Sequence, residues 1–186
     1  MPFIQIRYED IFFNPKVQEM CVSPAFTCPY YNHSWSCPPV APYMEEEISK
    51  YKIFYLVFSK FDLESYIKEM KAKYPRRSEY RIRNSFYMKS MYNNDLETEM
   101  ESFLNQYTAP YEKKLILFDG SCKVCYTKKD GKCTYDSGKP CRNPDEMKYS
   151  MEAVGIEVIR TVVNLKADIE YPSNKYHYRF GLVCFK

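Results

Sequence analysis

In the stretch Leu115-Ile116-Leu117-Phe118-Asp119-Gly120-Ser121-Cys122-Lys123-Val124-Cys125, an apolar run leads directly into a pair of cysteines. Residues 115–118 are all apolar, which is typical of a buried strand. Asp119 and Gly120 are residues that favour a turn. We therefore expect a strand at residues 115–118 that ends in a cysteine-containing loop.

Three other segments predict strands. Ile53–Phe58 and Tyr178–Phe185 are apolar runs of the kind that buried strands have, and residues 3–8 alternate apolar and polar side chains as a half-buried strand does. We expect residues 53–58, 115–118 and 178–185 to lie in one sheet.

Helices are expected between these strands. Asp62 is placed to accept hydrogen bonds at the beginning of a helix over residues 63–73. A helical stretch is predicted over about residues 78–107, because apolar side chains recur there at helical spacing. Ser150-Met151-Glu152-Ala153 begins a short helix that Gly155 interrupts.

These elements predict one α+β or α/β domain over residues 1–186, in which a small mixed sheet is flanked by helices. Two irregular cysteine-rich loops, 21–43 and 119–145, complete it. The chain contains neither Gly-x-Gly-x-x-Gly nor Gly-Lys-Ser/Thr, which excludes the common nucleotide-binding loops. No apolar run approaches the ~18 residues of a membrane helix, so we expect no membrane contact. The charged N-terminus differs from a secretory signal, so a cytoplasmic location is expected.

The cysteines have the spacing of metal ligands. Eight cysteines in 186 residues lie below the density of disulfide scaffolds, and cytoplasmic proteins rarely form disulfides. The C-terminal group, within 20 residues, consists of Cys122, Cys125, Cys133 and Cys141. Four thiolates hold one [4Fe–4S] cluster or one zinc ion. Because only Cys122 and Cys125 are close in sequence, the spacing favours the cluster, with zinc or unligated cysteines as alternatives.

The N-terminal group lies in a segment without charged residues, 21–44, and consists of Cys21, Cys28 and Cys37. Three thiolates are one fewer than a closed site needs. The fourth ligand could be His33 or Cys184, or it could be absent, which would leave an iron open to substrate with His33 or Tyr31 as proton donor. The alternative is that these cysteines are small buried apolar residues among Tyr30, Tyr31 and Trp35.

Several motifs resemble one family. They are Cys21, Cys28, Tyr31-Asn32-His33-Ser34-Trp35-Ser36-Cys37-Pro38-Pro39, Cys122-x2-Cys125, Cys141-Arg142-Asn143-Pro144 and Ser150-Met151-Glu152-Ala153-x-Gly155-Ile156-Glu157-Val158. The chain resembles domain-of-unknown-function family 2284, a family of predicted metal-binding proteins from archaea and anaerobic bacteria. The resemblance implies metal binding by these cysteines and no established reaction. Asn32 stands where the family tends to have glycine, and since both tolerate a positive φ we expect the turn to be retained.

Charge is unevenly distributed, although the formal net charge is only +3. Residues 71–91 contain seven basic side chains and one acidic one, interleaved with aromatic residues. This composition can bind RNA, but charge runs are more often solvated helix faces. We therefore do not expect nucleic acid as a partner, whereas a redox partner protein is expected. The oligomeric state is left open.

Three functions are compatible with these patterns. The first is an iron–sulfur protein of anaerobic metabolism that transfers electrons, with a [4Fe–4S] cluster on the Cys122–Cys141 loop and a second metal or cluster site on the N-terminal cysteines. The second is an enzyme that uses an open-coordination [4Fe–4S] centre to bind substrate or sulfur. The third is a binding module stabilised by zinc.

Overall fold

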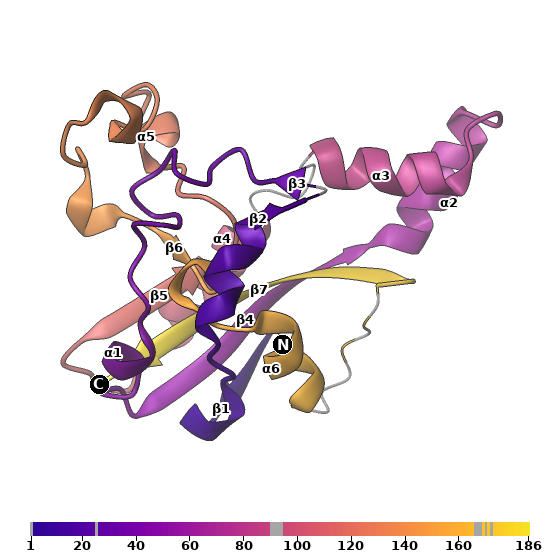
Figure 1. Cartoon of the computed structure of the whole chain (residues 1–186). Coiled ribbons are helices and arrows are strands. Elements are labelled where there is room, and N and C mark those ends of the chain that lie inside the picture. The colour runs from indigo at the N-terminus through magenta and orange to yellow at the C-terminus, as the bar shows by residue number, and fades with distance from the viewer. Residues whose placement is uncertain (1, 25, 90–94, 166–168, 170, 172) are drawn as a thin grey trace.

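A five-stranded mixed sheet forms the centre of the protein (Figure 1). The computed structural model describes residues 2–24, 26–89, 95–165, 169, 171 and 173–186. The strands in spatial order are β1 (Phe3–Ile6), β4 (Ile53–Asp62), β7 (Tyr176–Phe185), β5 (Lys114–Phe118) and β6 (Tyr149–Ser150). The β5–β6 pair is parallel, and the other pairs are antiparallel. The predicted α+β class and the four predicted strands are confirmed.

Helices and short turns connect the strands. The α-helices are α1 (Glu45–Ile48), α2 (Leu63–Lys73), α3 (Glu79–Lys89), α4 (Asp95–Gln106), α5 (Val124–Thr127) and α6 (Val158–Asn164). The 3-10 helices are Tyr8–Asp10, Pro15–Cys21, Tyr135–Ser137, Pro144–Glu146 and Glu152–Val154, and a small hairpin is formed by β2 (Val22–Ser23) and β3 (Phe26–Thr27). None of the helices among the described residues is long and apolar enough to span a membrane.

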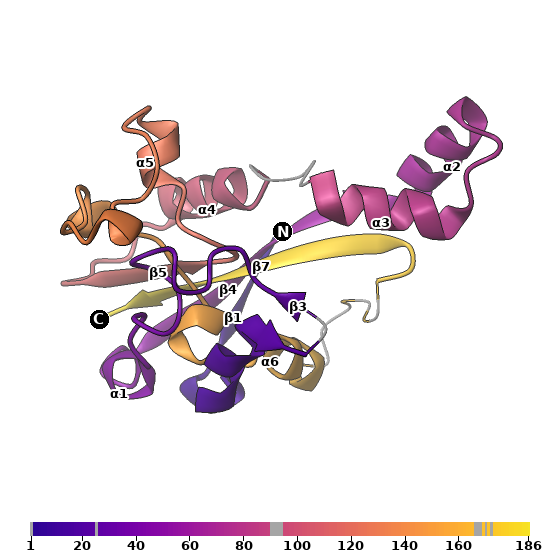
Figure 2. The ribbon, with the colours of Figure 1, turned by 45° about the horizontal axis from the view of Figure 1, so that its top comes forward.

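The central strands are apolar along residues 53–58 of β4 and 180–185 of β7, where both faces of the sheet are covered. Leu56 and Leu182 pack into the larger core cluster, whereas their neighbours Val57 and Val183 pack on the opposite face against α4. Figure 2 shows α4 on one side of the sheet and α1 and α6 on the other. A strand with two buried faces needs apolar residues at successive positions.

Gly181 allows β5 to approach β7 closely. A Cβ atom at this position would lie 2.6 Å from the Leu117 backbone oxygen and 1.9 Å from Cε of Met100. A larger residue would therefore push β5 or α4 away from the centre of the sheet.

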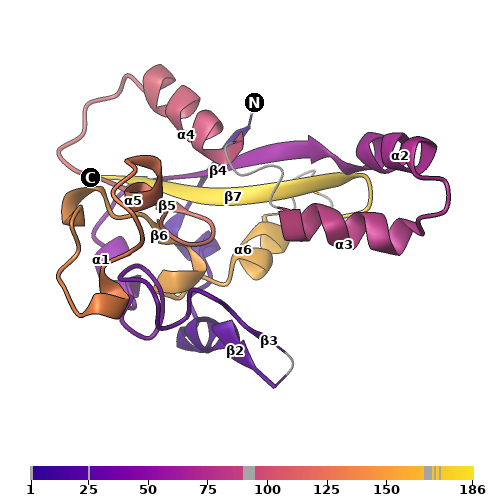
Figure 3. The same ribbon diagram turned by 90° about the horizontal axis from the view of Figure 1, so that it is seen from above.

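The paired strands β4 and β7 extend beyond their neighbours and carry α2 and α3 at their far end. Both strands pair over all ten residues, whereas β5 pairs with β7 only along Leu182–Phe185. The predicted cap is confirmed, because Asp62 accepts a hydrogen bond from the backbone N–H of Ser65 at 2.9 Å. Figures 1 and 3 show α2 and α3 as an arm at the opposite end of the molecule from α5.

Two predicted helices differ from the structure. The stretch expected over about 78–107 contains two helices, α3 and α4, and residues 90–94 between them lie outside the described residues. The apolar stripe was correctly placed in α4, where Leu96, Met100 and Phe103 are buried. The segment at Ser150 forms the strand β6 and a 3-10 helix rather than an α-helix. Gly155 ends that helix with a φ of +94°, as its interrupting position predicts.

Candidate metal centre

The two cysteine loops meet beside the sheet. Strand β5 leads into the second loop, and β6 follows it, so the parallel β5–β6 pair holds the two ends of this loop together. The first loop runs past it, between the β2–β3 hairpin and α1. Figures 1 and 3 show the segment before α1 next to the loop around α5.

Direct side-chain contacts join the loops. The Trp35 indole N–H donates to Thr134 Oγ1 at 3.3 Å and to the Lys139 carbonyl at 3.2 Å. The Trp35 ring also meets the Tyr135 ring edge-to-face with centroids 4.9 Å apart, and the Tyr135 hydroxyl donates to Asn32 Oδ1 at 2.6 Å. Asn32 has the expected positive φ, 57°. The aromatic residues of the motif therefore dock the two loops on each other.

Cys37 and Cys122 lie next to each other at this contact. The buried Ser36 hydroxyl accepts a hydrogen bond from the Cys122 backbone N–H at 3.3 Å and lies 3.9 Å from the Cys37 sulfur. Burial raises the pKa of the Cys37 thiol, and the charges of Cys28 and Cys122 add to this effect. Hydrogen bonds from Ser36 and Ser34 oppose it. A cysteine from the second loop therefore lies near Cys37.

Cys21 and Cys28 lie at the two ends of the β2–β3 hairpin. The Cys28 N–H donates to the Cys21 carbonyl at 2.8 Å, which closes the hairpin. The pKa of Cys21 is raised to about 11 by burial and then by the charges of Cys28 and Cys37. The three N-terminal cysteines are therefore close enough to interact, although they span a proline-rich segment.

The rest of the second loop is held by its own polar contacts. Asn143 donates an amide hydrogen bond to the Cys125 sulfur at 3.6 Å. The Arg142 guanidinium donates to the carbonyls of Asp130 and Lys132, on either side of Gly131. The pKa of Tyr149 is raised by burial and then by Cys141 and Cys122. Cys122 and Cys141 therefore both lie near Tyr149.

Cys184 and His33, the two residues considered as a fourth ligand of the first group, each have contacts with other parts of the protein. Cys184 lies in β7, fully buried in the apolar core, and burial alone raises the pKa of its thiol. The His33 ring is exposed and contacts Asp136 through Nδ1 at 2.8 Å. The cysteine spacing did not predict Cys122 as a neighbour of Cys37. Nor did the sequence patterns predict a role for the buried Ser34 and Ser36, although they flank Trp35 and Ser36 directly precedes Cys37.

The candidate donors are cysteine thiols, which both zinc and iron–sulfur clusters take as ligands. Among the parts of the chain that the structure describes, no three His, Cys, Asp or Glu side chains lie close enough together to share one metal ion. Zinc draws its sulfur ligands to about 2.3 Å from one point. A cluster leaves its cysteines farther apart, because iron and sulfide ions lie between them. The soft thiol groups of neighbouring cysteines are the donors that such clusters take.

The comparison with family models points to metal binding. A family model described as predicted metal-binding protein (DUF2284) matches residues 4–185. No curated protein and no solved structure matched the chain. Because the match covers nearly the whole chain and includes both cysteine loops, the chain belongs to domain-of-unknown-function family 2284, the predicted metal-binding proteins.

Proposed function

We propose that this protein is an iron–sulfur protein whose minimal function is electron transfer. The observation that supports it is the contact between the two cysteine loops, in which Ser36 bridges Cys37 and the backbone of Cys122. Because this contact brings Cys122 near Cys37, we assign Cys122 as the fourth thiol of the N-terminal group. Four thiols on two docked loops are the ligand number of a [4Fe–4S] cluster.

In this proposal the four ligands are Cys21, Cys28, Cys37 and Cys122. A bound [4Fe–4S] cluster would supply one-electron exchange at this position. The hydroxyls of Ser34 and Ser36 would donate hydrogen bonds toward the Cys37 sulfur, which is one of the ways in which proteins tune cluster potentials. The remaining three cysteines, Cys125, Cys133 and Cys141, would form a second site.

The competing assignment, which sequence spacing favours, keeps Cys122 with the other three cysteines of the second loop. The two assignments differ in which pair of substitutions causes loss of the same bound iron. In the structural assignment, Cys37→Ser and Cys122→Ser remove the same iron, whereas Cys133→Ser leaves it. In the spacing assignment, Cys122→Ser and Cys133→Ser remove the same iron, whereas Cys37→Ser leaves it.

The test is the iron and acid-labile sulfide content of protein purified without oxygen, with EPR after reduction by dithionite. We expect about four iron and four sulfide ions for each occupied cubane site. Cys184→Ser is the matched control, because it removes a cysteine from the core and should leave the iron content unchanged. Zinc without sulfide would overturn the proposal and leave a zinc-stabilised binding module.

An electron partner would approach the cysteine loops rather than the basic arm. Residues 71–81 are exposed and contain five basic side chains and one acidic one, but α2 and α3 lie at the far end of the molecule from α5 (Figures 1 and 3). Electron transfer is favoured by a short distance to the cluster. We therefore propose that the redox partner protein contacts the exposed surface around α5, where Tyr126 is 81% exposed.

A further inference from the structure

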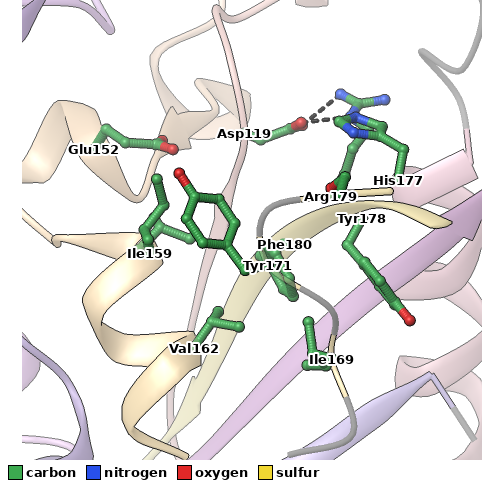
Figure 4. Close-up of a pocket in the computed structure, with 12 residues that line it drawn as sticks. Asp119, Glu152, Ile159, Val162, Ile169, Tyr171, His177, Tyr178, Arg179 and Phe180 are labelled. Atoms are coloured by element: carbon green, nitrogen blue, oxygen red, sulfur yellow. Dashed lines mark hydrogen bonds and ion pairs between the residues drawn. The ribbon is translucent and has the colours of Figure 1, made fainter. Parts of the chain in front are cut away.

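A cavity of about 330 Å³ lies between α6 and the far half of β7. Its apolar wall comes from α6, from β7 and from Ile169, and includes Val158, Ile159, Val162, Tyr178 and Phe180. Its polar end contains Asp119, Glu152, His177 and Arg179 (Figure 4). The volume is at the small end of the range for ligand pockets.

The cavity lies where β7 extends beyond the end of β5. Strand β5 ends at Phe118 and pairs with β7 only from Leu182 to Phe185, whereas β7 begins at Tyr176. The preceding part of β7 therefore has no β5 partner on that edge. Helix α6 packs nearby through Val162, and the side chains of the two elements enclose the space.

The only guanidinium among the described lining residues is already paired. Arg179 donates to both carboxylate oxygens of Asp119, and the two side chains are 11% and 24% exposed. An anion entering the cavity would have to compete with a two-point ion pair for this arginine. His177 does not supply a second cation, because burial and then Arg179 lower its pKa.

Glu152, unlike Asp119, lines the cavity without an ion pair to a lysine or arginine among the described residues. Its side chain is exposed and lines the cavity, close enough to Asp119 for the two carboxyl groups to interact. The polar end therefore contains two carboxyl groups and one guanidinium, so that a cation is the ligand charge that balances it.

We propose that this cavity binds a small organic amine, with its ammonium group between Glu152 and Asp119 and its apolar body against Val158, Val162 and Phe180. A neutral ligand would fill the apolar part but leave the Glu152 carboxylate without a counter-charge. A carboxylate ligand would add a third acid. The proposal goes beyond the iron–sulfur function and does not require an occupied cluster site.

The experiment measures binding of three matched probes to the whole protein by isothermal titration calorimetry. The probes are phenethylamine, the neutral 2-phenylethanol and the anionic 3-phenylpropionate. We expect phenethylamine to bind about tenfold more tightly than the alcohol or better, as a charge-assisted hydrogen bond provides, and the carboxylate to bind least.

Variants locate the site. Glu152→Gln should abolish the preference for the amine over the alcohol, and Ile159→Trp should weaken all three probes because the indole fills the cavity. Glu157→Gln is the control, because Glu157 lies at the beginning of α6, contacts Arg160 and does not line the cavity. Equal binding of amine and alcohol, a preference that survives in Glu152→Gln, or no binding at millimolar concentration would overturn the proposal. Iron content measured on the same samples reports on the cluster proposal separately.

Discussion

Replacing Gly155 with alanine is expected to destabilise the protein by two separable effects. Gly155 has a φ of +94°, a conformation that costs an L-residue about 1–2 kcal/mol. A Cβ atom there would also lie 2.3 Å from two ring carbons of Tyr43, so the ring or the backbone must move. Overpacking of this kind costs about 1–3 kcal/mol. The expected loss is therefore about 2–5 kcal/mol.

Gly138→Ala provides the matched control. Gly138 has a φ of +67° and a ψ of 12°, close to the ψ of 15° at Gly155, and a Cβ atom there would meet no atom within 4 Å. This variant should lose only the backbone part, about 1–2 kcal/mol. For a chain of this length each kcal/mol corresponds to about 2–4 °C in Tm.

The assay is urea unfolding followed by circular dichroism, on samples with equal metal content because bound metal shifts the apparent stability. In a Tyr43→Ala background the ring is absent, so Gly155→Ala should cost no more than Gly138→Ala does. The reasoning is refuted if Gly155→Ala and Gly138→Ala cost the same in the wild-type background, or if removing the Tyr43 ring does not reduce the cost at Gly155.

Three further substitutions test other parts of the fold. Asp62→Ala should lower the stability by about 1 kcal/mol in urea unfolding, since it removes the cap of α2, and an unchanged midpoint would contradict the capping role. Gly181→Ala should cost about 1–3 kcal/mol, because its Cβ would meet the Leu117 carbonyl, and wild-type stability would show that β5 can shift freely. The pKa of His177 is lowered in the folded state, so the unfolded chain binds more protons and stability falls as the pH drops below about 6.5. His177→Asn should reduce this loss in unfolding measured across a pH series, and an identical pH profile would contradict it.

Local patterns predicted most of the secondary structure because they depend on near neighbours in sequence. The apolar runs at Ile53–Phe58 and Tyr178–Phe185 became β4 and β7, although both strands extend further than predicted. The extensions contain Lys60 and Tyr176, which lie where the two strands pair only with each other. Because these extensions contain polar residues, a pattern of apolar residues does not predict them. The two-residue strands β2, β3 and β6 were missed for the related reason that they are too short for a period to be visible.

The sequence alone predicted the four longer strands, the cap at Asp62, the turn at Asn32 and the candidate cysteines as a set. Which of those cysteines are neighbours follows only from the tertiary structure. Spacing along the chain grouped Cys122 with Cys125, whereas the fold also places it beside Cys37. The cavity at Glu152 likewise depends on where β5 ends along β7. Such contacts join residues from distant segments, and their geometry follows from strand order, which no local pattern contains.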